Sequence, residues 1–242
     1  GECIADVDCF GECGGSATQE DCLAESGSCP TCIIVPTDQY PTIQSGIDAA
    51  VDGDTVLVEQ GTYYENLIIQ KSIYLLSRAV FDDLSTWMEY DDGYVVANQN
   101  IANTILDGSA DTNGEDFQSV ILINTPDGGC AEPIIQGFTI TGGGGTLVTN
   151  GDEQKVRGGG FLSNNAKPTF NYNLIANNEG DIYSGGGGGV DNEVTLATLP
   201  GYSWGNSNSC SSRDWMDMSY TAWGGNDASY GNSFAASNFD FD

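Results

Sequence analysis

A glycine-rich stretch near the middle of the chain constrains the fold most, because it contains the start of one structural unit twice. Residues 158–190 read GGGFLSNNAKPTFNYNLIANNEGDIYSGGGGGV. Glycines lead into an apolar residue at Gly160-Phe161 and again at Gly189-Val190, and the Asn-rich segments between them carry apolar residues at Phe170, Leu174 and Ile175. Repeated units that cannot bury their own apolar face stack and share one core. The stretch therefore predicts a solenoid.

Two further pairs of segments extend the repeat beyond this stretch. Ile68-Ile69-Gln70 recurs 66 residues later as Ile134-Ile135-Gln136, a spacing that fits three coils of about 22 residues. Pro133-Ile134-Ile135 recurs in outline 35 residues later as Pro168-Thr169-Phe170. The second spacing fits the repeat only if a loop is inserted.

The charge of the chain excludes several partners. It has 35 Asp and Glu residues against 6 Lys and Arg, no His, and a formal net charge of −29. Such a surface repels nucleic-acid phosphates and anionic lipid, and no apolar run is long enough to insert into a membrane. Copies of the chain also repel one another unless cations neutralise them. We therefore expect the chain to exist in salt or with calcium, which is the candidate cofactor.

The cysteines indicate an oxidising compartment. There are eight, six of them within residues 3–32, and an even number favours disulfides between Cys3, Cys9, Cys13, Cys22, Cys29, Cys32, Cys130 and Cys210. A zinc site at Cys29-Pro-Thr-Cys32 is the rival, although zinc sites usually pair two such elements or add His. The disulfide connectivity stays open.

The chain begins with Gly1-Glu2-Cys3 and not with a leader, so we expect a secreted protein whose signal peptide has been removed. It has no Asn-x-Ser/Thr sequon, which argues against eukaryotic N-glycosylation. We therefore expect a bacterial or archaeal protein located outside the cell or on the cell surface.

Local patterns are clearest in residues 33–80. Thr42 can cap a helix whose apolar stripe is Ile43, Ile47, Ala50 and Val51, and Asp52-Gly53-Asp54 ends it. The β-branched runs Thr55–Val58 and Leu67–Ile69 predict strands, separated by a turn over residues 59–62.

This region resembles a known family. The runs Tyr40-Pro41-Thr42-Ile43-Gln44, Ile47-Asp48-Ala49-Ala50, Asp52-Gly53-Asp54-Thr55-Val56 and Gly61-Thr62-Tyr63-Tyr64-Glu65-Asn66 look like the opening of the right-handed parallel β-helix, or pectin-lyase-like, superfamily. Residues 204–234 are similar to the last coils of secreted bacterial β-helix repeat proteins, and residues 8–17 to Cys-Gly-Gly linkers beside such domains. The resemblance implies an all-β, right-handed parallel β-helix with a short N-terminal capping helix. It implies little about activity.

Three segments follow from these observations. Residues 1–32 form a Cys-rich, disulfide-stapled segment, residues 33–234 the parallel β-helix, and residues 235–242 an acidic aromatic tail strand. Within the β-helix, residues 81–100 and 107–118 are polar, acidic and poorly patterned for strands. We expect both to be long loops, the part of a solenoid that carries any binding.

Enzymatic activity is weakly supported. The lyases of the resembled family use calcium and a basic residue, and the basic residues here are Lys71, Arg78, Lys155, Arg157, Lys167 and Arg213. The net negative charge opposes binding of an anionic polymer. No methylesterase motif follows Val120, and a glycosidase carboxylate pair stays open because 35 acids offer many pairs. We assign no catalytic residue.

Two acidic segments are candidate calcium loops, because alternating oxygen side chains around a glycine are typical of them. The better candidate ligands are Asp111, Asn113 and Glu115, and the weaker ones are Asp6 and Asp8. The alternative at both places is a solvated acidic turn.

Aromatic residues gather at the C-terminal end, where 9 of the 24 fall in residues 200–242. They could form a sugar-stacking platform, but a plug or protein interface is favoured, with candidate residues Trp223, Tyr230, Phe234, Phe239 and Phe241. Residues 238–242 alternate like a strand that can add to a neighbouring sheet.

The leading hypothesis is a secreted, non-catalytic structural protein that assembles head to tail into an extracellular filament or surface layer, since open contacts of this kind produce filaments. The alternative is a carbohydrate-active, polysaccharide lyase-like enzyme, or a glycan-binding or adhesin domain, that uses the loops in residues 81–118.

Overall fold

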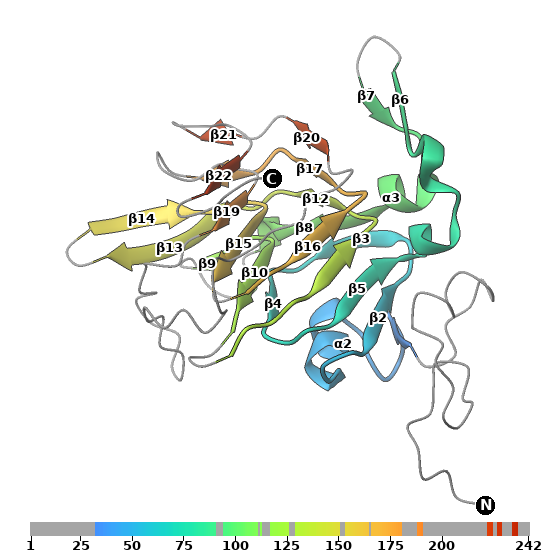
Figure 1. Cartoon of the computed structure of the whole chain (residues 1–242), viewed down its shortest axis with the longest axis horizontal. Helices are drawn as coiled ribbons and strands as arrows, with labels where there is room; N and C mark the ends of the chain where they lie inside the picture. Colours follow the sequence, from blue (N-terminus) through green and yellow to red (C-terminus); the bar gives the residue numbers. More distant parts are fainter. Residues whose placement is uncertain are drawn as a thin grey trace, which may run out of the picture.

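The fold is mostly strands in parallel sheets, with few and short helices (Figure 1). The computed structural model describes residues 32–90, 94–110, 112, 117–125, 129–150, 153–164, 166–180, 188–190, 222–224, 227–228 and 234–236. Within these residues the predicted all-β class is confirmed. No described helix is long and apolar enough to cross a membrane.

Three five-stranded sheets make up the body, and every strand pair in them is parallel. The first sheet is β1 (Ile33–Val35), β2 (Thr55–Val58), β5 (Tyr74–Ser77), β11 (Ile134–Gln136) and β16 (Thr169–Asn171). The second is β3 (Gly61–Tyr64), β8 (Thr104–Asp107), β12 (Thr139–Thr141), β17 (Leu174–Ala176) and β20 (Ala222–Gly224). The third is β4 (Leu67–Ile69), β10 (Ile121–Asn124), β15 (Phe161–Asn164), β19 (Gly188–Val190) and β22 (Phe234–Ala236).

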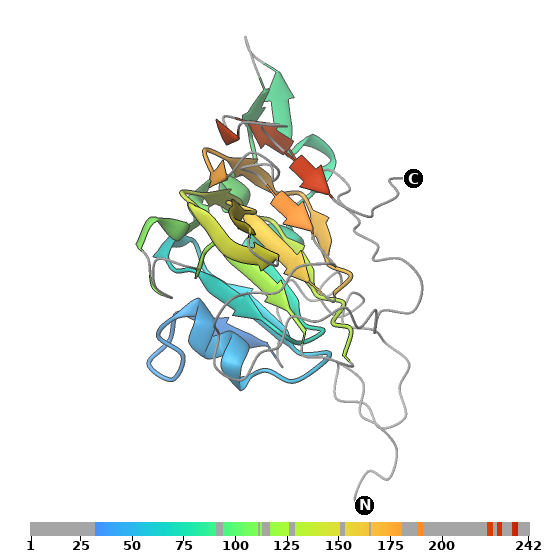
Figure 2. The same cartoon turned by 90° about the vertical axis from the view of Figure 1, so that its left-hand side faces the viewer.

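From β2 to β19 the chain visits the first, second and third sheets in a fixed rotation. We call one passage through the three sheets a coil. Figure 2 shows the strands of successive coils layered along the body, with the helix α2 (Ile43–Ala49) at one end.

The core lies between the sheets and consists of aliphatic and phenylalanine side chains in register. In the first sheet Leu75 pairs with Ile135, which pairs with Phe170, and all three are fully buried. Phe161 of the third sheet stacks on Phe170, with ring centroids 4.3 Å apart. Because side chains alternate between the two faces of a strand, one residue in two is enough to fill this core.

The corners of successive coils keep one conformation at a spacing of 35 residues. Gly137 (φ 88°) and Tyr172 (φ 52°) both have left-handed backbone, and so do Gly142 (φ 73°) and Asn177 (φ 57°). A Cβ atom on Gly137 would overlap the hydroxyl of Ser77. Glycine is therefore required at that corner for both space and conformation.

The structure confirms one predicted repeat and corrects two others. Ile134 pairs with Thr169 and Ile135 with Phe170, so the 35-residue spacing is confirmed. Ile68 and Ile134 are wrongly equated, because they lie in the third and the first sheet. The glycine runs are also offset by two residues, since Phe161 pairs with Gly188 and not with Val190. Buried strands of all three sheets are apolar, so similar residues do not identify the sheet.

The predicted helix and strands of residues 33–80 are largely correct. Thr42 caps α2, and strands β2 and β4 have the predicted bounds. The helix ends at Ala49, however, which leaves Val51 off its buried face and 64% exposed. The predicted turn over residues 59–62 is wrong in its second half, because pairing with β8 makes Gly61–Tyr64 a strand.

The prediction of a long loop over residues 81–100 is wrong. The segment has short elements: η1 (Arg78–Phe81), η2 (Leu84–Thr86), the antiparallel strands β6 (Met88–Tyr90) and β7 (Tyr94–Val96), and α3 (Gln99–Asn103). Buried Trp87 and Ile101 anchor it on the body, where Trp87 meets Tyr172 edge-on with ring centroids 6.0 Å apart. These apolar residues are too few to give the segment a strand pattern in the sequence, but their burial still fixes its position on the body.

Two other insertions are partly described. Residues 107–118 contain η3 (Gly108–Ala110) and β9 (Phe117–Gln118). The loop required by the 35-residue spacing is the antiparallel hairpin of β13 (Gly145–Asn150) and β14 (Glu153–Arg157), which joins β9 and projects from the body (Figure 1). A last pair, β18 (Glu179–Gly180) with β21 (Asp227–Ala228), is parallel.

Candidate functional site

The sequence-predicted site residues fall mostly outside the described part of the chain. The two described cysteines, Cys32 and Cys130, are disulfide-bonded, and no described cysteine is free. Trp223 lies in β20 and Phe234 in β22. Residues outside the described part are the cysteines Cys3, Cys9, Cys13, Cys22, Cys29 and Cys210, the metal candidates Asp111, Asn113, Glu115, Asp6 and Asp8, and the interface candidates Tyr230, Phe239 and Phe241.

No described group of three or more His, Cys, Asp or Glu residues could hold a metal ion. This finding concerns the described part alone, so the predicted calcium sites stay predictions.

The basic residues whose side chains are placed all have partners. Lys71 donates from Nζ to the carbonyl oxygens of Ile47, Asp48 and Ala50, at 3.0, 2.9 and 2.6 Å, and so caps the C-terminus of α2. The ammonium of Lys167 lies 3.7 Å from the carboxylate of Glu132. Arg78 pairs with Glu59. Lys155 and Arg157 lie in β14, and Arg213 is outside the described residues.

One end of the stack of coils is built around α2. The carboxylate of Glu65, which follows β3, accepts the backbone N–H groups of Ile43 and Gln44, both at 3.0 Å. Thr42 and Ser45 form a reciprocal capping box at the same terminus. The first-turn N–H groups, which have no partner within a helix, are thereby satisfied.

Gln44 also closes the outer edge of the third sheet. The N–H of Leu67 points toward the β10 side, where it donates at 2.7 Å to the carbonyl of Val120, the residue before β10. Ile68 is therefore the residue of β4 that faces the outer edge. The side-chain amide of Gln44 accepts from the Ile68 N–H at 2.8 Å and donates to the Ile68 carbonyl at 3.2 Å. One side chain therefore makes both bonds that a neighbouring strand would make.

No described residue covers the outer edge of the second sheet in this way. Strand β3 pairs with β8 on one side only and ends the sheet. The N–H of Glu65 points to Asp107 of β8, so Thr62 and Tyr64 face the other way. Both are exposed, Tyr64 to 58%, and their backbone groups bond to no described residue. An uncovered edge of this kind is a template for a further strand.

A polar groove of about 520 Å³ opens at the corner between β2 and β3. It is lined by Glu59, Gln60, Arg78, Phe81, Asp82 and Asn100. Gln60 donates to the side-chain oxygen of Asn100 at 2.8 Å, and Asn100 donates to Asp82 at 2.7 Å. These contacts join the corner after β2 to the excursion that follows β5.

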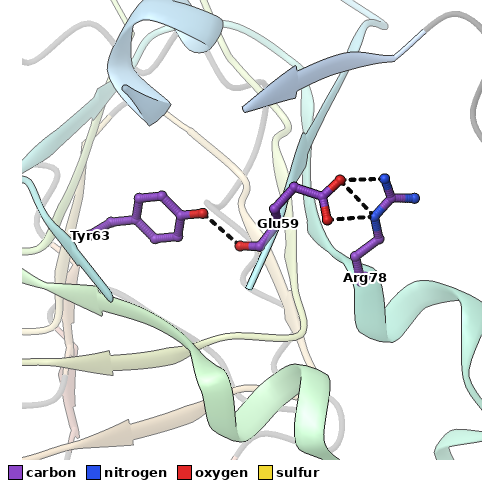
Figure 3. A network of polar contacts seen from close by, with 3 residues as sticks. All are labelled: Glu59, Tyr63 and Arg78. Carbon is purple, nitrogen blue, oxygen red and sulfur yellow. Dashed lines mark hydrogen bonds and ion pairs between the residues drawn. The ribbon is translucent and has the colours of Figure 1, made fainter. Parts of the chain in front are cut away.

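Two residues that line the groove form an ion pair. Arg78 donates from Nε to both carboxylate oxygens of Glu59 at 3.1 Å and from Nη2 to one of them (Figure 3). Its guanidinium lies 5.6 Å from the ring centroid of Phe81. The hydrogen bond to Glu59 raises the pKa of Arg78, so Arg78 keeps its charge and is held by that carboxylate.

Tyr63 supports the same corner from inside. Its hydroxyl donates to the Glu59 backbone carbonyl at 2.7 Å (Figure 3). Burial raises the pKa of Tyr63 from 10.0 to about 12, and the carboxylates of Glu59 and Glu65 act in the same direction. Tyr63 is thus a neutral hydrogen-bond donor throughout the physiological range.

Sequence reasoning missed the groove and both edges. The sequence predicts only a turn at Glu59 and Gln60 and only a candidate base at Arg78. The β-branched and aromatic residues of the run Gly61-Thr62-Tyr63-Tyr64 are the sequence signal that could have marked β3 as a strand.

No protein-family model matches this chain, and neither a curated protein nor a solved structure is significantly similar to it.

Proposed function

We propose that this chain is a right-handed parallel β-helix of the pectin-lyase-like kind, and that it serves outside the cell as a non-catalytic structural protein assembling head to tail. The rotation of the chain through three parallel sheets supports the β-helix. The acidic surface and the disulfide-bonded Cys32 and Cys130 support an extracellular location, where such bonds persist.

One observation carries the assembly: within the described residues, all three sheets are parallel and end at the same two ends of the stack. One end has β1, β3 and β4, and the other has β16, β20 and β22. A second copy placed end to end in the same direction would present a parallel strand to each sheet. A contact between two different surfaces that repeats without closing produces a filament.

The proposed assembly includes calcium because negatively charged copies of the chain repel each other where they meet. The net charge of −29 opposes close packing of copies, and a divalent cation lowers that repulsion. Electron microscopy of the purified chain with calcium, and then with chelator, tests the assembly. We expect filaments or stacked particles with calcium and shorter ones with chelator. Single particles under both conditions would contradict the proposal.

The groove favours a second candidate, glycan binding. It combines amide groups, a carboxylate, a guanidinium and an aromatic ring, the mixture that fixes and stacks sugars. Its ionic groups are Glu59, Asp82 and Arg78, a net charge of −1, so neutral sugars fit it better than uronates.

Calorimetric titration with neutral and acidic oligosaccharides tests this candidate. Gln60→Ala should weaken binding about fivefold, the effect of losing one hydrogen bond, whereas the exposed control Gln39→Ala should not. Release of unsaturated products from an acidic polysaccharide would instead show a lyase.

A further inference from the structure

We infer that the second sheet is the one that continues between copies, with the outer edge of β3 accepting β20 of a second copy. This inference rests on the proposed head-to-tail assembly and identifies its junction. It follows from a comparison of the three sheet edges at the α2 end, which differ in whether their outward backbone N–H and carbonyl groups are available to a further strand.

The third sheet is closed. Ile68 is the outward-facing residue of β4, and the amide of Gln44 satisfies both its N–H and its carbonyl. Gln44 is itself held in place, because its backbone N–H donates to Glu65 and its side-chain nitrogen also donates to Asp48 at 2.8 Å. A strand arriving at β4 would have to displace this side chain and would gain no new backbone bond.

The first sheet offers little. The Val35 carbonyl accepts from Glu59 on the β2 side at 2.9 Å, so Ile34 is the one residue of the three-residue strand β1 that faces outward. Ile34 is half-buried. A single shielded residue cannot anchor a strand.

Among the described residues the second sheet is open, because the N–H and carbonyl groups of Thr62 and Tyr64 face away from β8 and both residues are exposed. The matching strand of a second copy is β20, which ends the same sheet at the opposite end. Both strands are parallel to every other strand of that sheet. A copy stacked head to tail therefore brings β20 to β3 in the direction that parallel pairing requires.

Proline substitution at the open edge tests the inference. The Thr62 N–H faces away from β8, so Thr62→Pro removes an outward donor and adds a ring at the edge without breaking a bond within the sheet. Thr62→Val is the matched control, because it keeps the N–H and the branched shape. Sedimentation velocity with calcium should show association of Thr62→Pro at least tenfold weaker than wild type, with Thr62→Val close to wild type. Circular dichroism and the thermal midpoint check that both variants fold.

A second variant makes the test independent of how well proline is tolerated. Gln44→Leu removes the cover of Ile68 and should leave association unchanged or stronger. The choice of sheet is overturned if folded Thr62→Pro and Thr62→Val associate equally well. It is also overturned if folded Gln44→Leu loses association. In either case the assembly itself stands. A wild-type chain that stays monomeric overturns the assembly and this junction together.

Discussion

Asn173 and Phe138 lie one coil apart and are joined through a buried side chain: the Asn173 side-chain oxygen accepts the Phe138 N–H at 2.9 Å. The same amide donates to the Ile135 carbonyl, also at 2.9 Å. Asn178 repeats the arrangement five residues later, with Gly143 as donor at 2.9 Å. At these corners the buried asparagines add side-chain bonds between coils to backbone bonds such as that from the Gly137 N–H to the Asn171 carbonyl at 3.2 Å.

Replacing Asn173 with alanine should therefore lower the free energy of unfolding by about 2–4 kcal/mol, because one buried N–H and one buried carbonyl lose their partner. Urea denaturation followed by circular dichroism measures this. Asn103→Ala is the control, since Asn103 is exposed and bonds to an exposed glutamine; it should change the value by no more than about 0.5 kcal/mol. Equal effects of the two changes would contradict the role of the corner.

Gly137→Ala should destabilise the chain by about 2–5 kcal/mol, because alanine adds left-handed strain and overlaps Ser77. Gly53→Ala separates the two causes: Gly53 has φ 90°, but an added Cβ would have nothing within 4 Å. We expect about 1–2 kcal/mol for that control. The difference in thermal or urea stability between the two variants gives the part of the destabilisation that comes from steric overlap with Ser77. No difference would show that Ser77 moves aside freely.

Lys71→Met should destabilise the α2 end by about 1–3 kcal/mol, since one ammonium serves three carbonyls at the helix C-terminus. The comparison is Lys167→Met, which breaks an ion pair at 3.7 Å to a Glu132 side chain that is 63% exposed. Pairs of that kind contribute about 0.5 kcal/mol or less. Hydrogen exchange of α2 should accelerate in the first variant alone.

Tyr63 predicts a loss of stability at high pH. Its folded pKa of about 12 lies above the ordinary value of 10.0, so the unfolded chain releases the proton first. The stabilisation is complete below pH 10 and is lost as the pH rises toward 12. Unfolding of wild type and Tyr63→Phe should be compared from pH 9 to 12, with ultraviolet absorbance to follow the phenolate. The wild type should lose more stability over this interval, and parallel curves would contradict the pKa.

Apolar alternation and turn chemistry, read along the chain, predicted the strands β2 and β4, the Thr42 cap and the 35-residue repeat, because these depend on neighbours in sequence. They did not predict β3, whose strand conformation depends on pairing with β8, or the hairpin of residues 88–96, anchored by the buried Trp87. The groove was missed for the same reason, since Glu59 and Arg78 meet only when two coils stack.

The sequence by itself thus determined that this chain is β-rich, acidic and repetitive, since spacing, charge and composition are properties of the linear chain. Tertiary structure alone decided which coil faces which, that Gln44 closes one sheet edge, and that no described residue covers another edge at Thr62 and Tyr64. Those outcomes depend on backbone groups, which every residue carries and which no side-chain pattern distinguishes until the strands are placed in register.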